Sequence, residues 1–235
     1  TGIALPEVVW AHGFVMIGGG KLSKSDAELL DLGALIERHG CDALRYVLLA
    51  EAPWDRDRDF PSAEAFLQQF DNRYNADLAN DLGNLLNRSV SMIQKYRDGA
   101  IPAGGGTELD ALVESALVEY HAHMEKLELH RAIETAMSVV RDANGFIDAA
   151  KPWSLAKDPS ESARLDDVLG ALVRGLAAAA VALAPFMPSK SEEIWRRLGG
   201  DGQVPAFAEL ARRLPSRLPA QSEGVLFPRS DITDG

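Results

Sequence analysis

The 235-residue sequence contains a single cysteine, Cys41. One cysteine cannot form a disulfide within the chain, and it leaves no Cys-x-x-Cys pair with which a zinc knuckle would begin. We therefore expect a protein of a reducing, intracellular compartment, in which any structural metal would be bound by histidine and carboxylate groups. Three histidines, His121, His123 and His130, lack the i, i+4 spacing of a ligand pair on a helix, so we expect no metal site.

Long apolar runs are also missing. The longest, from Leu176 to Phe186, is far shorter than the roughly 20 residues that a membrane-spanning helix needs. The first ten residues, TGIALPEVVW, have neither the basic start nor the apolar core of a signal peptide, and they do not begin with methionine. We expect no membrane association, and we expect the chain to begin inside a longer protein.

Basic residues are few compared with acidic ones. Lys and Arg total 24 while Asp and Glu total 35, so the formal net charge is −11. A protein that binds nucleic acid non-specifically over a large surface would be basic overall, so the charge argues against a general nucleic-acid coat protein. A local RNA site built from a few well-placed cations remains open, because such a site can work on an acidic body.

Helical periodicity is the main feature that is present. Apolar side chains recur every three or four residues from Phe66 to Tyr96, which predicts one long amphipathic helix that follows a cap at Ser62. Pro152 suits the first position of a short helix. Asp31 is predicted to cap a helix over about 33–39. Further helices are predicted over about 42–51, 109–127, 129–149, 165–183 and 191–198. The C-terminal two thirds is therefore predicted to be an antiparallel helix bundle with short connections.

The remaining segments are predicted to be strands or irregular. Residues 7–17 are β-branched and apolar, which predicts one or two short strands. The glycines at 18–20 predict a mobile loop, and the alternating charges of 53–61 predict a solvated connector. The tail from Gly199 is rich in Pro, Gly and Arg and carries the sequence LFPR near its end.

The strongest local signal is the sequence GGGKLSKS at residues 18–25. Lys21 and Lys24 lie three residues apart on a glycine-hinged loop, with hydroxyls at Ser23 and Ser25. Ammonium groups on a loop that can close suit an anionic phosphate ligand. The order differs from a Walker loop, in which Gly-Lys-Ser/Thr leads into a helix. Composition alone fits a solvated surface turn equally well.

In its context this segment resembles the Lys-Met-Ser-Lys-Ser signature of class I aminoacyl-tRNA synthetases. The sequence HGF at 12–14 precedes it and CDALRY at 41–46 follows it. Leu22 stands where the signature has methionine, and this change conserves side-chain volume.

Three later segments make the chain similar to the methionyl-tRNA synthetases within that class. These segments are NADLANDLGNLLNR at 75–88, KPWSLAK at 151–157 and LFPR at 226–229. The match covers nearly the whole chain in the right order. Leucyl, valyl and cysteinyl enzymes share the lysine loop and the helical domain, but they fit these three segments less well.

The resemblance implies a mainly α fold in two parts. Residues 1–61 would be the end of a Rossmann-type catalytic domain, with the lysine loop and stem-contact helices. Residues 62–235 would be the anticodon-binding helix bundle with a C-terminal tail. The family's His-Ile-Gly-His element does not occur in these residues. We therefore expect the C-terminal portion of a longer enzyme, without zinc in this portion and unable to activate methionine alone.

The implied function is that of a cytoplasmic methionine–tRNA ligase. Such an enzyme uses ATP with Mg²⁺ to form methionyl-adenylate, and it then transfers methionine to the terminal ribose of tRNA(Met). By the resemblance, Lys24 would contact the ATP triphosphate and stabilise the charge that develops as methionine attacks the α-phosphate. Lys21 would assist at the phosphates, and Ser23 and Ser25 would shape the ATP-binding loop.

Asn84, Arg88 and Trp153 match the family's anticodon readers. At about 100° per residue, Asn84 and Arg88 lie on one helical flank beside the apolar stripe. An amide and a guanidinium can both bind an unstacked base edge, and an indole face can stack on a base. Without the resemblance, Asn84 and Arg88 would fit an ordinary solvated flank and Trp153 a core aromatic.

Three other interpretations remain at this stage. One is a non-enzymatic tRNA-binding module that uses the bundle alone. A second is another class I synthetase, most plausibly cysteinyl or leucyl. A third is a helical scaffold, which predicts no salt-dependent RNA binding.

Overall fold

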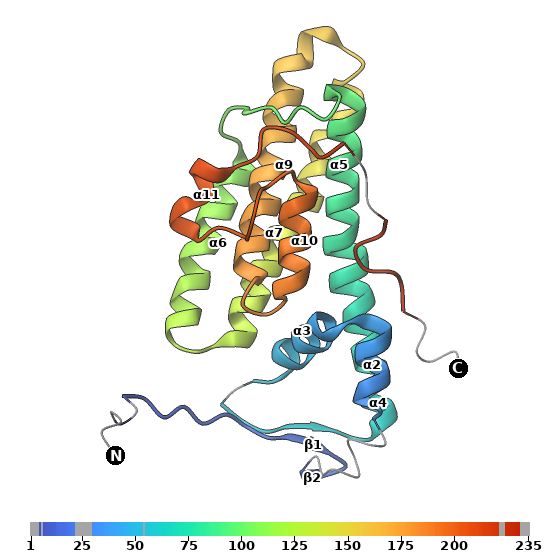
Figure 1. Cartoon of the computed structure of the whole chain (residues 1–235), viewed down its shortest axis with the longest axis vertical. Coiled ribbons are helices and arrows are strands. Elements are labelled where there is room, and N and C mark those ends of the chain that lie inside the picture. Colours follow the sequence, from blue (N-terminus) through green and yellow to red (C-terminus); the bar gives the residue numbers. More distant parts are fainter. Residues whose placement is uncertain (1–4, 6, 22–29, 54, 221–223, 231–235) are drawn as a thin grey trace.

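The computed structural model describes residues 5, 7–21, 30–53, 55–220 and 224–230. Helices dominate it, as the three- and four-residue apolar spacing predicts (Figure 1). The elements in chain order are β1 (Val15–Ile17), β2 (Gly20–Lys21), α2 (Leu32–His39), α3 (Cys41–Glu51), β3 (Arg58–Phe60), α4 (Ala63–Arg73), the π-helix η1 (Tyr74–Gly83), α5 (Asn84–Arg97), α6 (Glu108–Glu125), α7 (Leu129–Ala150), α8 (Pro152–Leu155), the 3₁₀ helix η2 (Pro159–Glu161), α9 (Ser162–Leu183), α10 (Pro188–Arg197) and α11 (Phe207–Arg213).

The long helices form the predicted antiparallel bundle, with α9 at its centre (Figure 1). From Val168 to Leu183, α9 is buried on nearly every side because it contacts α5, α6, α7 and α10. Four consecutive alanines, Ala177–Ala180, allow neighbouring helices to approach closely. Tyr120 of α6 donates a hydrogen bond from its hydroxyl to the carbonyl of Ala182 at 2.8 Å. No helix in the described part of the chain is both long and apolar enough to span a membrane.

A small sheet lies at one end of the bundle, below α3 in Figure 1. Its strand order is β2–β1–β3, with β1 antiparallel to β2 and parallel to β3. The register places Val15 opposite Arg58 and Ile17 opposite Phe60. The mainly α fold class, a helix bundle preceded by a smaller N-terminal unit, is therefore confirmed.

Several local predictions are confirmed by cap geometry. The hydroxyl of Ser62 accepts a hydrogen bond from the Ala65 amide at 3.2 Å, which satisfies one of the free donors at the start of α4. Asp31 caps α2 in the same way through the amide of Ala34 at 3.0 Å. Pro152 occupies the first turn of α8.

The predicted connector at 53–61 is solvated at residues 55–57 and 59, but it also contains β3, which was not predicted. Asp57 accepts a hydrogen bond from the backbone amide of Phe14 at 2.7 Å, and Asp59 accepts one from Gly19 at 3.2 Å. The two carboxylates therefore hold the β1–β2 region in place. Within the described part of 7–17, Val15–Ile17 form one strand, which confirms the prediction of one or two short strands.

The long helix predicted from Phe66 to Tyr96 is continuous, but its middle ten residues form a π-helix. The apolar residues Phe70, Tyr74, Leu78 and Leu82 are spaced by four residues, which a wider turn keeps facing the core better than an α turn does. The side-chain amide of Asn144 on α7 also donates a hydrogen bond to the carbonyl of Asp81 at 3.1 Å. A neighbouring helix therefore supplies a donor to a backbone carbonyl of the π-helix.

The tail after Gly199 contains a helix, α11, that was not predicted from the sequence. Helix α11 lies against α9. With only seven residues, α11 is too short for an apolar repeat to be recognised in the sequence. Its position is set by this tertiary contact.

Candidate functional site

The first lysine of the GGGKLSKS segment lies on a β-hairpin. Gly18 and Gly19 have φ values of +60° and +78°, a left-handed conformation that glycine adopts without strain, and they form the turn between β1 and β2. This turn replaces the irregular glycine loop predicted for 18–20. Lys21 is exposed on β2, with its ammonium 3.9 Å from the centroid of the Phe14 ring. Ser23, Lys24 and Ser25 lie outside the described residues.

Asn84 and Arg88 lie one turn apart on α5. Asn84 is exposed and is the first residue after the π-helix. Arg88 is half-buried, and its guanidinium forms an ion pair with Asp148 of α7 at 2.6 Å. The carboxylate of Asp148 is 66% exposed. The guanidinium is therefore held beside α7, and an anion or base edge from solvent can compete with Asp148 for it.

Trp153 lies just beyond the end of α7, five residues after Asp148. Lys151 adopts a left-handed conformation at φ 48°, which ends α7 and begins α8. Pro152 is buried, whereas Trp153 is 42% exposed. A core role for the Trp153 indole is therefore excluded, and the ring is available to stack on a partner.

The structure separates the predicted residues into two groups. Asn84 and Arg88 lie on one helix, and the Asp148 ion pair joins that helix to the end of α7, near Trp153. Lys21 belongs to the sheet at the lower end of the molecule, whereas the yellow connection after α7 lies at its upper end (Figure 1). A single ligand that reaches both groups must be long.

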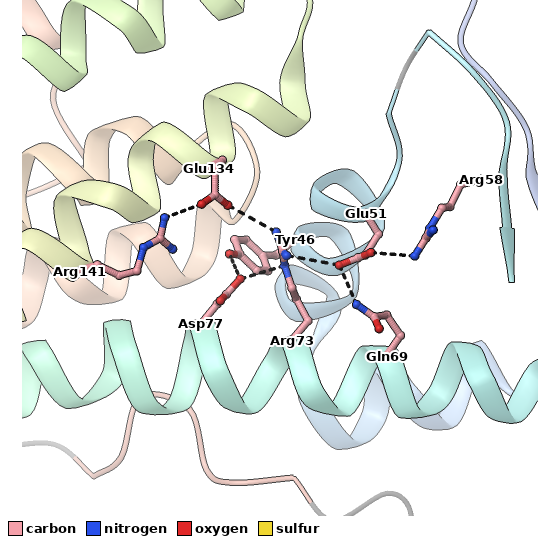
Figure 2. Close-up of polar contacts among 8 residues, drawn as sticks. All are labelled: Tyr46, Glu51, Arg58, Gln69, Arg73, Asp77, Glu134 and Arg141. Carbon is pink, nitrogen blue, oxygen red and sulfur yellow. Dashed lines mark hydrogen bonds and ion pairs between the residues drawn. The ribbon is translucent and has the colours of Figure 1, made fainter.

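A network of charged side chains joins the N-terminal unit to the bundle (Figure 2). The Tyr46 hydroxyl on α3 donates to Asp77 of η1 at 2.6 Å, and Arg73 forms an ion pair with the same carboxylate at 2.9 Å. Arg73 also lies 3.4 Å from Glu51 of α3 and 3.8 Å from Glu134 of α7. Burial raises the pKa of Tyr46 well above its usual value, and the Asp77 carboxylate adds to the effect.

The network extends on both sides of Arg73. On one side, Glu51 accepts a hydrogen bond from Gln69 at 3.1 Å and pairs with Arg58 of β3 at 3.2 Å. On the other side, Arg141 pairs with Glu134 at 2.5 Å along α7. Figure 2 shows the side chains from α3, the α4–η1 helix and α7 converging on Arg73. Because β3 pairs with β1, these contacts fix the lysine hairpin relative to the bundle.

Residues that sequence reasoning missed are mainly partners across helices. Asp148 was not predicted, although its position five residues before Trp153 was a usable signal. Arg229 belongs to the LFPR segment, and its guanidinium donates a hydrogen bond to the amide oxygen of Asn80 at 3.0 Å. Among the described residues, no group of three or more His, Cys, Asp or Glu side chains is placed to hold a metal ion.

Replacing Asp148 with asparagine is expected to strengthen binding of an anionic ligand at Arg88 about two- to fivefold, because the change frees the guanidinium from a largely exposed ion pair. Titration of a fluorescently labelled anionic ligand, followed by fluorescence anisotropy, measures the change in affinity. The control is Asp142→Asn, which removes an exposed carboxylate elsewhere on α7. Equal gains in both variants would show a general charge effect and contradict the role of the ion pair.

Comparison with known families matches almost the whole chain. The family described as "tRNA synthetases class I (M)" matches residues 1–90. The family described as "Anticodon-binding domain of tRNA ligase" matches residues 108–219. The Lys21 hairpin and Asn84–Arg88 fall in the first match, and Trp153 falls in the second.

Curated relatives are similar over the same length. The methionine–tRNA ligase of Halalkalibacterium halodurans is 39% identical over 240 residues, which cover 99% of this chain and 36% of the relative. That of Bacillus subtilis is 41% identical over 203 residues, which cover 84% of this chain and 30% of the relative. The chain thus spans about a third of the length of these relatives.

Solved structures show the same similarity in three dimensions. Mycobacterium tuberculosis methionyl-tRNA synthetase bound by methionyl-adenylate superposes with a TM-score of 0.82 at 34% identity, covering 97% of this chain and 45% of that chain. The apo form of the same enzyme gives a TM-score of 0.80 at 32% identity, with 98% and 45% covered.

Proposed function

The chain belongs to the methionyl-tRNA synthetase family of class I, and from this premise we propose that it serves a methionine–tRNA ligase in two ways. Its bundle would bind the anticodon loop of tRNA(Met), and its lysine hairpin would help to close the ATP site. The observation that carries the proposal is the grouping of the exposed Asn84 and half-buried Arg88 on α5 with the exposed Trp153 on α8, next to the end of α7 that pairs with Arg88.

These three side chains have the chemistry that single-stranded RNA requires. The Asn84 amide offers one donor and one acceptor to a base edge, and the Arg88 guanidinium offers a planar fork. An unstacked anticodon base would lie on the exposed Trp153 indole, which replaces the stacking that the base loses when it leaves the loop. In this proposal Arg88 exchanges the Asp148 carboxylate for a base edge or a phosphate.

The lysine hairpin would act on the ATP triphosphate. Methionine activation joins the methionine carboxylate oxygen to the α-phosphorus of MgATP and breaks the bond to pyrophosphate. Negative charge develops on the phosphate oxygens during this step, and ammonium groups close to them lower its energy. Lys24 would stabilise this charge, Lys21 would bind the phosphates, and Ser23 and Ser25 would position the loop. Mg²⁺ enters with ATP as part of the substrate.

We propose the same division of the chain as the sequence indicates, with residues 1–61 serving the catalytic side and 62–235 serving the anticodon. The whole enzyme would act in the cytoplasm on methionine, MgATP and tRNA(Met). The hairpin lies at the lower end of the molecule and the connection after α7 at the upper end (Figure 1), so a tRNA bound by its anticodon at the upper end would be long enough to bring its terminal ribose toward the catalytic side.

Binding of anticodon stem–loop RNA by the 235-residue chain tests the proposal. We expect tighter binding of the tRNA(Met) stem–loop than of the same RNA with a scrambled anticodon, and we expect the affinity to fall with rising salt. Fluorescence anisotropy at two salt concentrations measures both effects. Equal affinity for the two loops would overturn anticodon recognition by this chain.

A further inference from the structure

A groove lies where the end of η1 and the start of α5 face the C-terminal tail. One wall is formed by Asn80 and Asn84, both exposed, and by the half-buried Asn87. The other wall is the tail segment, defined here as residues 224–230, which passes beside α5 in Figure 1 while α7 lies on the other side of that helix. The groove is open to solvent and has a volume of about 630 Å³.

We infer that this groove binds a second unstacked base of the anticodon loop, with Arg229 as its cationic group. This inference rests on the proposed function, because Asn84 lines the groove and also lies one turn from Arg88. A base in the groove would therefore neighbour the base that stacks on Trp153. The two bases would lie on opposite sides of the exposed edge of α5.

The helix wall carries amide groups and no formal charge. Each of Asn80, Asn84 and Asn87 can donate and accept a hydrogen bond, which matches the mixed donors and acceptors on base edges. A carboxylate wall would repel an RNA backbone, and an apolar wall would favour a protein partner. The amide composition thus favours a nucleotide base over either alternative.

The tail wall supplies a cation and apolar surface. Arg229 is exposed, and in the described part of the chain its guanidinium contacts the amide oxygen of Asn80, an uncharged acceptor. Val225 is 61% exposed, and Pro228 is also exposed. These two side chains give a base an apolar surface to lie against, while Arg229 is placed to meet a base edge or a phosphate.

The tail is held firmly enough to act as a wall. The Asn75 amide donates to the Ser230 carbonyl at 2.8 Å and accepts from the Ser230 amide at 2.9 Å. Leu226 and Phe227 are buried, and the Lys190 ammonium donates to the Leu226 carbonyl at 2.9 Å. Contacts on both sides of Arg229 fix its backbone, so the groove is formed before any ligand binds.

Phe227 of the tail packs next to Gly83, at the end of η1. A Cβ atom at Gly83 would lie 3.0 Å from the Leu78 carbonyl and 3.9 Å from the Phe227 ring. The Phe227 ring also packs edge-on against Tyr74, with ring centroids 6.1 Å apart. The close fit of the tail onto the end of η1 thus positions Arg229 opposite the three asparagines.

The test uses the 235-residue chain and a labelled tRNA(Met) anticodon stem–loop. Arg229→Ala is expected to weaken binding about fivefold or more, as loss of one base contact does, and Asn87→Ala on the other wall is expected to act in the same direction. The control Arg131→Ala removes an exposed arginine near the start of α7, far along that helix from Asp148, and is expected to leave the affinity within about twofold.

Abasic RNAs identify the base concerned. Each anticodon nucleotide is made abasic in turn, and at one position Arg229→Ala is expected to cause no further loss, because the base that it contacts is already gone. A thermal unfolding midpoint for each variant checks that the tail remains folded. If Arg229→Ala lowers the unfolding midpoint, the RNA affinity of Asn87→Ala alone tests whether the groove binds a base.

The outcomes separate this inference from the proposed function. If the unaltered chain binds all loops equally, the proposed function fails. If it discriminates between loops while both Arg229→Ala and Asn87→Ala bind like the unaltered chain, the second-base inference is overturned and the proposed function stands. The inference would also be overturned if Arg229→Ala and Asn87→Ala weakened binding of the stem duplex alone as much as binding of the stem–loop. Binding of a free mononucleotide as tight as that of the stem–loop would overturn it too.

Discussion

Asp77→Ala is expected to lower the free energy of unfolding by about 3 kcal/mol, because it removes the carboxylate that both Tyr46 and Arg73 contact. The Tyr46 side chain is fully buried, so its hydroxyl cannot turn to water for a new partner. Arg73, which is 24% exposed, keeps only the longer contacts to Glu51 and Glu134. Urea unfolding followed by circular dichroism measures the loss.

The matched control is Glu134→Ala, at the exposed end of the same network. Glu134 is 59% exposed and lies 3.8 Å from Arg73, so its loss is expected to cost about 0.5 kcal/mol or less. Tyr46→Phe removes only the hydroxyl and should fall between the two variants, at about 1 kcal/mol. Similar losses for Asp77→Ala and Glu134→Ala would contradict a central role for Asp77.

Trp153→Ala is expected to weaken binding of the tRNA(Met) anticodon stem–loop about tenfold or more, since base stacking on an aromatic side chain contributes ~1–3 kcal/mol. The indole is 42% exposed, so its removal should leave the thermal unfolding midpoint nearly unchanged. Fluorescence anisotropy with labelled RNA measures the affinity. Trp153→Phe keeps an aromatic face and should recover part of the loss.

An exposed tryptophan in the other part of the chain provides the control. Trp10 is 39% exposed and belongs to the segment before β1. Trp10→Ala is expected to leave stem–loop affinity unchanged, because an anticodon stem–loop bound at α5 and α8 does not reach that segment. A tenfold loss in both variants would indicate non-specific contact with exposed indoles rather than a defined anticodon site.

Much of the helical architecture could be predicted from the sequence because one apolar face repeats along each long helix. The caps at Asp31 and Ser62 were predictable for the same reason, since capping depends on residues only three apart. Strand β3 was not predictable in this way. Its partner β1 lies more than 40 residues earlier, and the alternating charges of its sequence are typical of a solvated segment.

The candidate site shows the same limit. Asn84, Arg88 and Trp153 could be selected from residue type, spacing and resemblance. Their partners could not, because the Arg88–Asp148 ion pair joins residues 60 positions apart and the Arg229–Asn80 contact joins residues 149 apart. Such pairs depend on how the helices and the tail pack, which local pattern does not determine.

The π-helix at Tyr74–Gly83 makes this stretch sensitive to changes in chain length. Deleting one residue from it would favour an ordinary α turn and would rotate α5 by about 100° relative to α4. Asn84 and Arg88 would then leave the edge between α7 and the tail, although their identities and spacing would be unchanged. We therefore expect alignments of related sequences to carry no gap between Tyr74 and Gly83.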